Sequence, residues 1–228
     1  MNIRLMNRAL ALGLLVATGP VWADGPWEVV HQGTKRGEVT SYVKAVDGHD
    51  VKAFKGVVEA PMPMSALLAV LTTVDSLPEW VFQCVRARHD AGWPEPVHYL
   101  EFHAPWPVSN REVVVRNNYS QDPQTYTVSV MTTAITGYMP EADGKVRVPE
   151  LNNRFIFEPL KDGWTRVTFE TLVDPGGSLP AWVANWVATS APRVTLNGMM
   201  KLAAQPRFRN KPVEEIKLPG LKSWRMPP

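Results

Sequence analysis

The chain has 228 residues, with 24 Lys and Arg against 22 Asp and Glu, 45% hydrophobic residues and 20% charged residues. This composition is ordinary for a globular protein and excludes a disordered chain, a collagen and a coiled coil. The length fits one compact domain with a large core. A net charge of +2 provides no strongly basic surface, so we expect no nucleic-acid partner.

Residues 1–23 have the pattern of a secretory signal peptide. Arg4 and Arg8 precede an apolar run at residues 9–17, and small residues follow up to Ala23. The run is shorter than the roughly 20 residues that span a bilayer, so cleavage after Ala23 is favoured over a retained anchor. No lipobox cysteine lies near that point. We therefore expect a soluble periplasmic protein of a Gram-negative bacterium.

Cys84 is the single cysteine of the chain, so it cannot form a disulfide within it. Stability must therefore come from the core. Because Cys84 follows an apolar segment and no activating neighbour is evident, we interpret it as a small buried residue rather than a nucleophile.

The first half of the chain predicts a hairpin followed by two helices. Residues 26–32 are short enough to be a helical lead-in or coil. β-Rich segments at 39–46 and 51–58 flank a turn with Asp-Gly and predict a hairpin. Helical spacing follows at 63–71, with a proline at its start, and another short helical piece begins at 77–80.

Four further strands are expected at residues 85–89, 97–104, 112–119 and 125–135. Short, turn-rich connections favour antiparallel pairing of consecutive strands, so we predict a meander.

A polar, turn-rich loop at residues 137–149 precedes two last strands at 153–157 and 165–173. Alternation along these strands places one set of side chains toward a helix: Phe155, Phe157, Val167, Phe169, Thr171 and Val173.

A long C-terminal helix follows, with Ser178 as its predicted cap and Pro180 in its first turn. It continues to about residue 204, and Pro192 should kink it. Spacings of three and four place one row on a strongly apolar side: Trp182, Trp186, Thr189 and Arg193. We expect residues 206–228 to form an irregular tail. The element order predicts an α+β fold in which a curved antiparallel sheet wraps around the terminal helix.

No catalytic or metal-binding motif is evident. The chain lacks Gly-x-Ser-x-Gly, a phosphate-binding glycine loop and His-Glu-x-x-His, and its five histidines lack metal spacing. His98 and His103 should point to opposite faces of one strand, and we interpret both as surface or sheet-edge histidines.

Several ionisable residues lie inside predicted strands: Glu101, Arg116, Arg154 and Glu170. Buried in a pocket, such groups would orient a ligand head group. The favoured interpretation is an outward face with cross-strand ion pairs, which alternation supports for Arg166 and Glu170.

Two segments contain distinctive motifs. Residues 99–112 contain Pro105-Trp106-Pro107 and end in Ser-Asn-Arg-Glu, between two predicted strands. Residues 165–169 contain a Thr-Arg-x-Thr strand, and residues 174–185 begin with an Asp-Pro-Gly-Gly turn into a helix. Both segments resemble the corresponding motifs of the START (steroidogenic acute regulatory protein-related lipid transfer) family. The resemblance extends over residues 27–204.

This resemblance implies a helix-grip fold with a closed hydrophobic tunnel beneath the terminal helix, and no metal or organic cofactor. Family members often carry an arginine on the strand after the Pro-x-Pro turn, whereas this chain has Asn117 there and Arg116 one residue away. A shift of one residue changes the face of the strand, so Arg116 does not inherit that role. The candidate ligand-binding residues are Tyr99, Glu101, Val115, Asn117, Phe155, Phe157, Phe169, Thr171, Trp182 and Trp186.

We expect a monomer whose lipid-binding domain spans residues 24–205. It would bind a lipid or sterol, with transfer between membranes and transient membrane contact as further expectations. Loop 137–149 and the kink at Pro192 are the predicted gates. One alternative is an enzyme on the same fold with Tyr99, Glu101 or His103 as acid or base. The other is a lipid-responsive interaction module whose tail contacts a partner.

Overall fold

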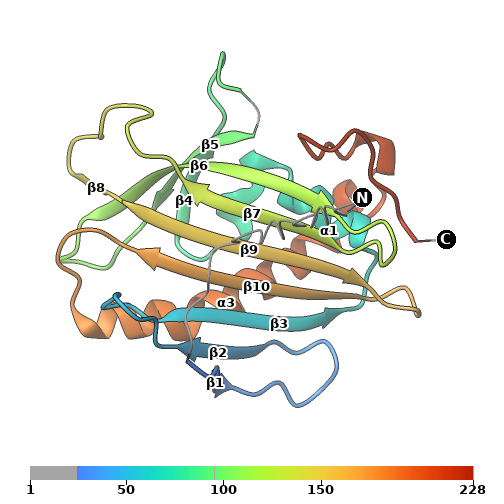
Figure 1. Cartoon of the computed structure of the whole chain (residues 1–228), viewed down its shortest axis with the longest axis horizontal. Helices are drawn as coiled ribbons and strands as arrows, with labels where there is room; N and C mark the ends of the chain where they lie inside the picture. The colour runs from blue at the N-terminus through green and yellow to red at the C-terminus, as the bar shows by residue number, and fades with distance from the viewer. Residues whose placement is uncertain (1–24, 95, 228) are drawn as a thin grey trace, which may run out of the picture.

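The computed structural model describes residues 25–94 and 96–227, so the predicted signal peptide and its cleavage after Ala23 lie outside the described residues. A curved sheet dominates the structure (Figure 1). Its strands follow the order β1-β2-β3-β10-β9-β7-β6-β5-β4, all antiparallel, and the short β8 pairs in parallel with β6. The strands are β1 (Glu28–His31), β2 (Thr40–Lys44), β3 (Ala53–Ala60), β4 (Cys84–Arg88), β5 (Val97–Phe102), β6 (Asn110–Gln121), β7 (Val128–Ala134), β8 (Lys145–Arg147), β9 (Glu150–Pro159) and β10 (Thr165–Asp174).

The predicted hairpin and meander are confirmed. β2 pairs with β3, and β4 to β7 pair consecutively, because short turns join strands that each have an apolar face. Residues 26–32 differ from the prediction, since they contain the edge strand β1. All four residues of β1 are exposed, so the strand lacks the apolar alternation that would identify it from sequence.

Helix α3 (Ala181–Ala203) packs against β2 and β3 and lies behind the sheet in Figure 1. We call the sheet face that it covers the inner face. Gly56 of β3 permits this packing, because a Cβ there would lie 2.7 Å from Leu196 Cδ1 and 3.0 Å from Pro192 Cβ. The shorter helices α1 (Met64–Leu71) and α2 (Leu77–Trp80) also contact α3.

The start and the buried side of α3 differ from the prediction. Pro180 is the N-cap residue and the helix begins at Ala181, so Ser178 is not the cap. The turn before it has Gly176 and Gly177 at φ +67° and +61°, a conformation that glycine adopts without strain.

Trp182, which we expected to be buried, is 53% exposed, and Trp186 is only partly buried. Thr189 and Arg193 of the same predicted row are exposed. The side of α3 that packs is instead formed by Val183, Ala188, Ala191, Pro192, Thr195, Leu196, Met199, Leu202 and Ala203. Small residues on this side let the helix approach the sheet closely, and the aromatic row therefore turns away from it.

The tail is more ordered than predicted. It contains the short helix α4 (Pro206–Arg209) and a 3₁₀ turn at Val213–Glu215. Phe208, Ile216 and Leu218 are buried in the main hydrophobic cluster. Farther along, Gln121 exchanges two hydrogen bonds with the backbone of Arg225, at 2.7 and 2.9 Å.

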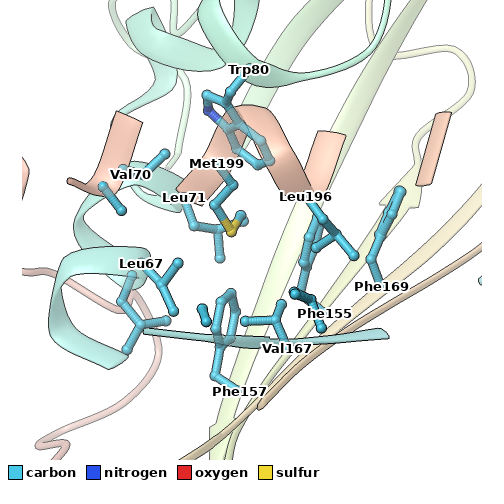
Figure 2. Packing of buried hydrophobic residues seen from close by; sticks show 14 of the residues in the cluster. Leu67, Val70, Leu71, Trp80, Phe155, Phe157, Val167, Phe169, Leu196 and Met199 are labelled. Carbon is cyan, nitrogen blue, oxygen red and sulfur yellow. The ribbon is translucent and has the colours of Figure 1, made fainter. Parts of the chain in front are cut away.

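The main core lies between α1, α3 and the inner face of β9 and β10. Figure 2 shows Leu67, Leu196 and Met199 pointing toward the phenylalanines of the sheet. Phe155 stacks on Phe169 with ring centroids 4.5 Å apart. This end of the inner face is therefore closely filled by side chains.

Candidate functional site: the inner face of the sheet

The strand register places four polar side chains in line across the inner face. Thr171 of β10 pairs with Asn153 of β9, Asn153 pairs with Thr132 of β7, and Thr132 pairs with Asn117 of β6. We call these four residues the polar row. Two candidate residues from the sequence, Asn117 and Thr171, belong to it, whereas Thr132 and Asn153 were not predicted.

The polar row separates two different halves of the inner face. On one side lie Phe155, Phe157 and Phe169, which belong to the packed core. On the other side lies an aliphatic cluster that includes Val115 and Leu151. Side chains around this cluster keep part of their surface exposed: Leu77, Ala87, Phe102, Ala134 and Val173.

Helix α3 carries two more partly buried apolar side chains, Trp186 and Val187, and Val187 packs against the main cluster rather than the aliphatic one. Trp186 contacts Phe82 edge to face, with ring centroids 4.9 Å apart. We call this region, from the polar row to the aliphatic cluster, the open half of the inner face. Phe155, Phe157 and Phe169 lie outside it, in the filled half.

Hydrogen bonds connect the polar row in pairs. Thr132 Oγ1 donates to Asn117 Oδ1 at 2.7 Å, and Asn117 Nδ2 donates to Tyr119 Oη at 3.2 Å. Thr171 Oγ1 donates to Asn153 Oδ1. The Nδ2 donor of Asn153 has no partner among the described residues.

Charge is concentrated on the outer face. The charged side chains of β3, β5, β6, β9 and β10 that face outward are Lys55, Glu59, Glu101, Glu112, Arg116, Glu150, Arg154, Glu158, Arg166, Glu170 and Asp174. The predicted cross-strand pairing holds for Arg166, which lies 2.9 Å from Glu59. Arg116 faces outward as expected from its one-residue offset from Asn117.

Among the described residues of β3, β5, β6, β9 and β10, only Arg111 places a charged side chain on the inner face. It is 7% exposed and lies at the start of β6. Its guanidinium donates to the Ser109 carbonyl at 2.5 Å and the Gly176 carbonyl at 3.4 Å. Arg111 therefore joins the loop before β6 to the turn before α3.

Tyr99 and Glu101 lie on the outer face, because they pair with Val114 and Glu112 rather than with inner-face positions. Tyr99 Oη donates to Glu112 Oε2 at 2.7 Å. Lys145 Nζ lies 2.6 Å from Glu101 Oε2. These contacts place both residues in an ion-pair network on the side of the sheet opposite Asn117.

Glu112 is the centre of this network and is fully buried. Arg147 donates two hydrogen bonds to Glu112 Oε1, at 2.7 and 3.1 Å, and the Ala142 amide donates a third at 2.8 Å. Burial alone would raise the pKa of Glu112, but these donors and the Tyr99 hydroxyl outweigh burial and hold the pKa below its ordinary value. The predicted gate at residues 137–149 is thus anchored to a buried carboxylate.

His98 and Cys84 are both buried. His98 faces inward and is not a surface residue, so our interpretation of it was wrong. Burial and the neighbouring His89 lower the pKa of His98 to about 4, which keeps it neutral. Burial raises the pKa of the Cys84 thiol to about 12, consistent with an unreactive structural cysteine.

Pockets lie beside the sheet in the described part of the chain. One of about 220 Å³ lies on the outer face beside Tyr42, Glu59 and Arg166. Another, of about 160 Å³, lies between His98, Tyr119 and the tail. Within residues 25–94 and 96–227, no three His, Cys, Asp or Glu side chains gather as they would around a metal ion. None of the helices in this part of the chain is long and apolar enough to cross a membrane.

These features define an α+β helix-grip protein whose inner face combines apolar side chains with a short polar row. The family model of the START domain matches residues 23–202, and the chain belongs to this family.

Individual proteins support the assignment. The uncharacterized protein PA1579 of Pseudomonas aeruginosa is 31% identical over 171 residues, which is 72% of this chain and 82% of that protein. The phosphatidylcholine transfer protein of Rattus norvegicus is 28% identical, over 67% of this chain and 72% of its own length. A STAR-related lipid transfer protein fragment from Xanthomonas axonopodis has 29% identity and a TM-score of 0.70, over 80% of this chain and 100% of the fragment. Human STARD10, with 21% identity and a TM-score of 0.66 over 81% of this chain and 76% of its own, shares the fold.

Proposed function

We propose that this protein binds one lipid in the open half of the inner face, beneath α3, and carries it between membranes. The observation behind the proposal is the arrangement of partly exposed apolar side chains around a polar row, on a face that the helix covers. Apolar burial would supply the affinity, and the polar row would orient the ligand. The relatives named for lipid transfer support this proposal.

The membrane contact is proposed to involve two exposed tryptophans. Trp106 is 90% exposed in the loop between β5 and β6, and Trp182 is 53% exposed in the first turn of α3. Arg111 joins the two segments that carry them. Tryptophan partitions favourably into the interface between membrane and water.

Transfer of radiolabelled lipids from donor to acceptor vesicles tests this proposal. We expect the protein to accelerate transfer, and Trp106→Ser and Trp182→Ser to slow it while leaving the fold intact. Val29→Ser is the matched control, because Val29 is similarly exposed but lies on the edge strand β1. Transfer at the spontaneous rate with the wild-type protein would contradict the proposal.

A carrier without catalytic activity is proposed over an enzyme. Tyr99 and Glu101 bind other side chains on the outer face, and His103 is exposed beyond the end of β5. None of these three residues shares the inner face with the open half. Recovery of chemically unaltered lipid after incubation supports the carrier.

We further propose that the mature protein is periplasmic and monomeric and begins near Asp24. The basis for the localisation and for the first residue is the signal-peptide pattern of residues 1–23. N-terminal sequencing of the periplasmic fraction should yield Asp24 as the first residue. A retained Met1 in the membrane fraction would contradict this localisation.

A further inference from the structure

The polar row offers hydrogen bonds without charge. Its side chains are two threonines and two asparagines, whose hydroxyl and amide groups both donate and accept. Asn153 Nδ2 is a donor without a partner among the described residues. Asn153 is only partly buried, so this amide can meet a ligand. It would suit a hydroxyl or an ester carbonyl, each of which presents an uncharged acceptor.

Among the residues that the structure describes, none would provide a counter-charge for a phosphate or quaternary ammonium group at the polar row. Moving an ionic group from water to a poorly hydrated site is costly unless an opposite charge compensates it. The strand register directs the carboxylates of the neighbouring strands outward, as with Glu101, Glu158 and Glu170. The short helix α2 directs Leu77 toward the aliphatic cluster, and its acidic residue Glu79 is exposed.

Arg111 does not supply this counter-charge at the polar row. It precedes Asn117 by six residues on β6, which corresponds to about 20 Å along a strand. Its two terminal guanidinium nitrogens donate to the carbonyl groups of Ser109 and Gly176, and its buried Nε has no partner among the described residues. Because Arg111 is a cation on the same face of the sheet, the test includes an anionic lipid for comparison.

We infer that the ligand is a lipid whose polar group is an uncharged hydroxyl or ester, held by Thr132 and Asn153 of the polar row. The apolar body of this lipid lies against Ala134, Val173 and Leu77. The inference rests on the proposed function and narrows it to neutral lipids such as diacylglycerols or sterols. The acyl esters of phosphatidylcholine would also suit Asn153, so the distinction from that lipid rests on the uncharged side chains of the polar row.

A competition experiment tests the inference. The delipidated protein is equilibrated with vesicles that contain equal mole fractions of dioleoylglycerol, cholesterol, dioleoylphosphatidylcholine and dioleoylphosphatidylglycerol. The protein is then re-isolated, and its bound lipid is identified by mass spectrometry. We expect dioleoylglycerol or cholesterol to be enriched at least about tenfold over both phospholipids. Which of the two neutral lipids is enriched distinguishes an acylglycerol ligand from a sterol ligand.

Matched variants connect that preference to the polar row. Thr132→Val and Asn153→Leu should each reduce the enrichment several-fold to about tenfold, as expected for one lost hydrogen bond. Thr133→Val makes the same substitution one residue away, on the outer face, and should leave the enrichment unchanged.

Preferential capture of either phospholipid by the wild-type protein would overturn the inference and leave the proposed function standing. Equal enrichment in wild type, Thr132→Val and Asn153→Leu would overturn the assignment to the polar row. Capture of no lipid class would overturn the proposed function and this inference with it.

Discussion

Glu112 is a fully buried carboxylate on the outer face, and it accepts hydrogen bonds from Tyr99, Ala142 and Arg147. Removing one member of a buried ion pair leaves an uncompensated charge and costs about 3–5 kcal/mol. We therefore expect Glu112→Gln to lower the free energy of unfolding by that amount in urea denaturation. Glu158→Gln is the control, because its pair with Arg166 spans 4.0 Å and is solvent-exposed; it should cost under about 1 kcal/mol.

The same residue predicts a pH dependence of stability. The pKa of Glu112 is held below its ordinary value of 4.5 in the folded protein, so the folded state binds its proton more weakly than the unfolded state does. Its stabilisation is complete above pH 4.5 and is lost as the pH falls through the folded pKa. Urea denaturation between pH 3 and 7 should show a shallower acid loss in Glu112→Gln than in wild type. Parallel curves for the two proteins would contradict this role.

Gly56 explains how closely α3 approaches the sheet. A methyl group at this position would overlap Leu196 and Pro192, so Gly56→Ala should destabilise the protein by about 1–3 kcal/mol. Adding Leu196→Val should remove part of that overlap and make the double variant more stable than the sum of the single changes predicts. Strict additivity in thermal and urea denaturation would show that Gly56 and Leu196 are not in contact.

At the scale of elements, the positions of the strands were easier to predict from sequence than the face of the sheet on which each side chain lies. Alternation along β9 and β10 placed Phe155, Phe169 and Thr171 on the inner face, as the register confirms. β5 gave no such signal, because Val97, His98, Tyr99 and Leu100 are all buried. One side of β5 meets the aliphatic cluster and the other meets the loop between β7 and β8, so Tyr99 and Glu101 could not be assigned to a face from their sequence.

The long helix posed a different problem. The row with Trp182 and Trp186 has the helical period, but the side with Ala188 and Ala191 has it too. The side that packs meets Gly56 through Pro192 and Leu196, and an interpretation weighted by hydrophobic size ranks its alanines below tryptophan. The polar row was partly missed for a related reason. Its members are distant in sequence, and only the pairing of four strands brings them together.

The tail provides a prediction at this scale. Ile216 is fully buried in the main cluster, and its carbonyl accepts a hydrogen bond from Trp224 Nε1 at 3.0 Å. Ile216→Ala should therefore cost about 2–5 kcal/mol in urea denaturation, as large-to-small changes in a core do. Lys222→Ala, at an exposed position in the same tail, should have almost no effect. A loss below about 0.5 kcal/mol for Ile216→Ala would show that the tail does not pack in solution.

At the scale of the whole molecule, the sheet, α3 and the tail together produce an inner face that is filled at one end and partly open at the other. Three of the aromatic residues first considered for ligand binding, Phe155, Phe157 and Phe169, belong to the core at the filled end. The lipid binding that we propose depends on the open half, where Ala134 and Val173 retain exposure beside the polar row. This division separates the residues that hold the fold from those proposed to hold the ligand.

Native mass spectrometry of protein purified from cells tests lipid binding on the inner face most directly. We predict one lipid per chain in the wild type and none in Ala134→Trp, because the larger side chain fills the space beside the polar row. Thr133→Trp, which adds similar bulk on the outer face of the same strand, should retain the lipid. A wild type without lipid, or equal occupancy in wild type and a folded Ala134→Trp variant, would contradict the account.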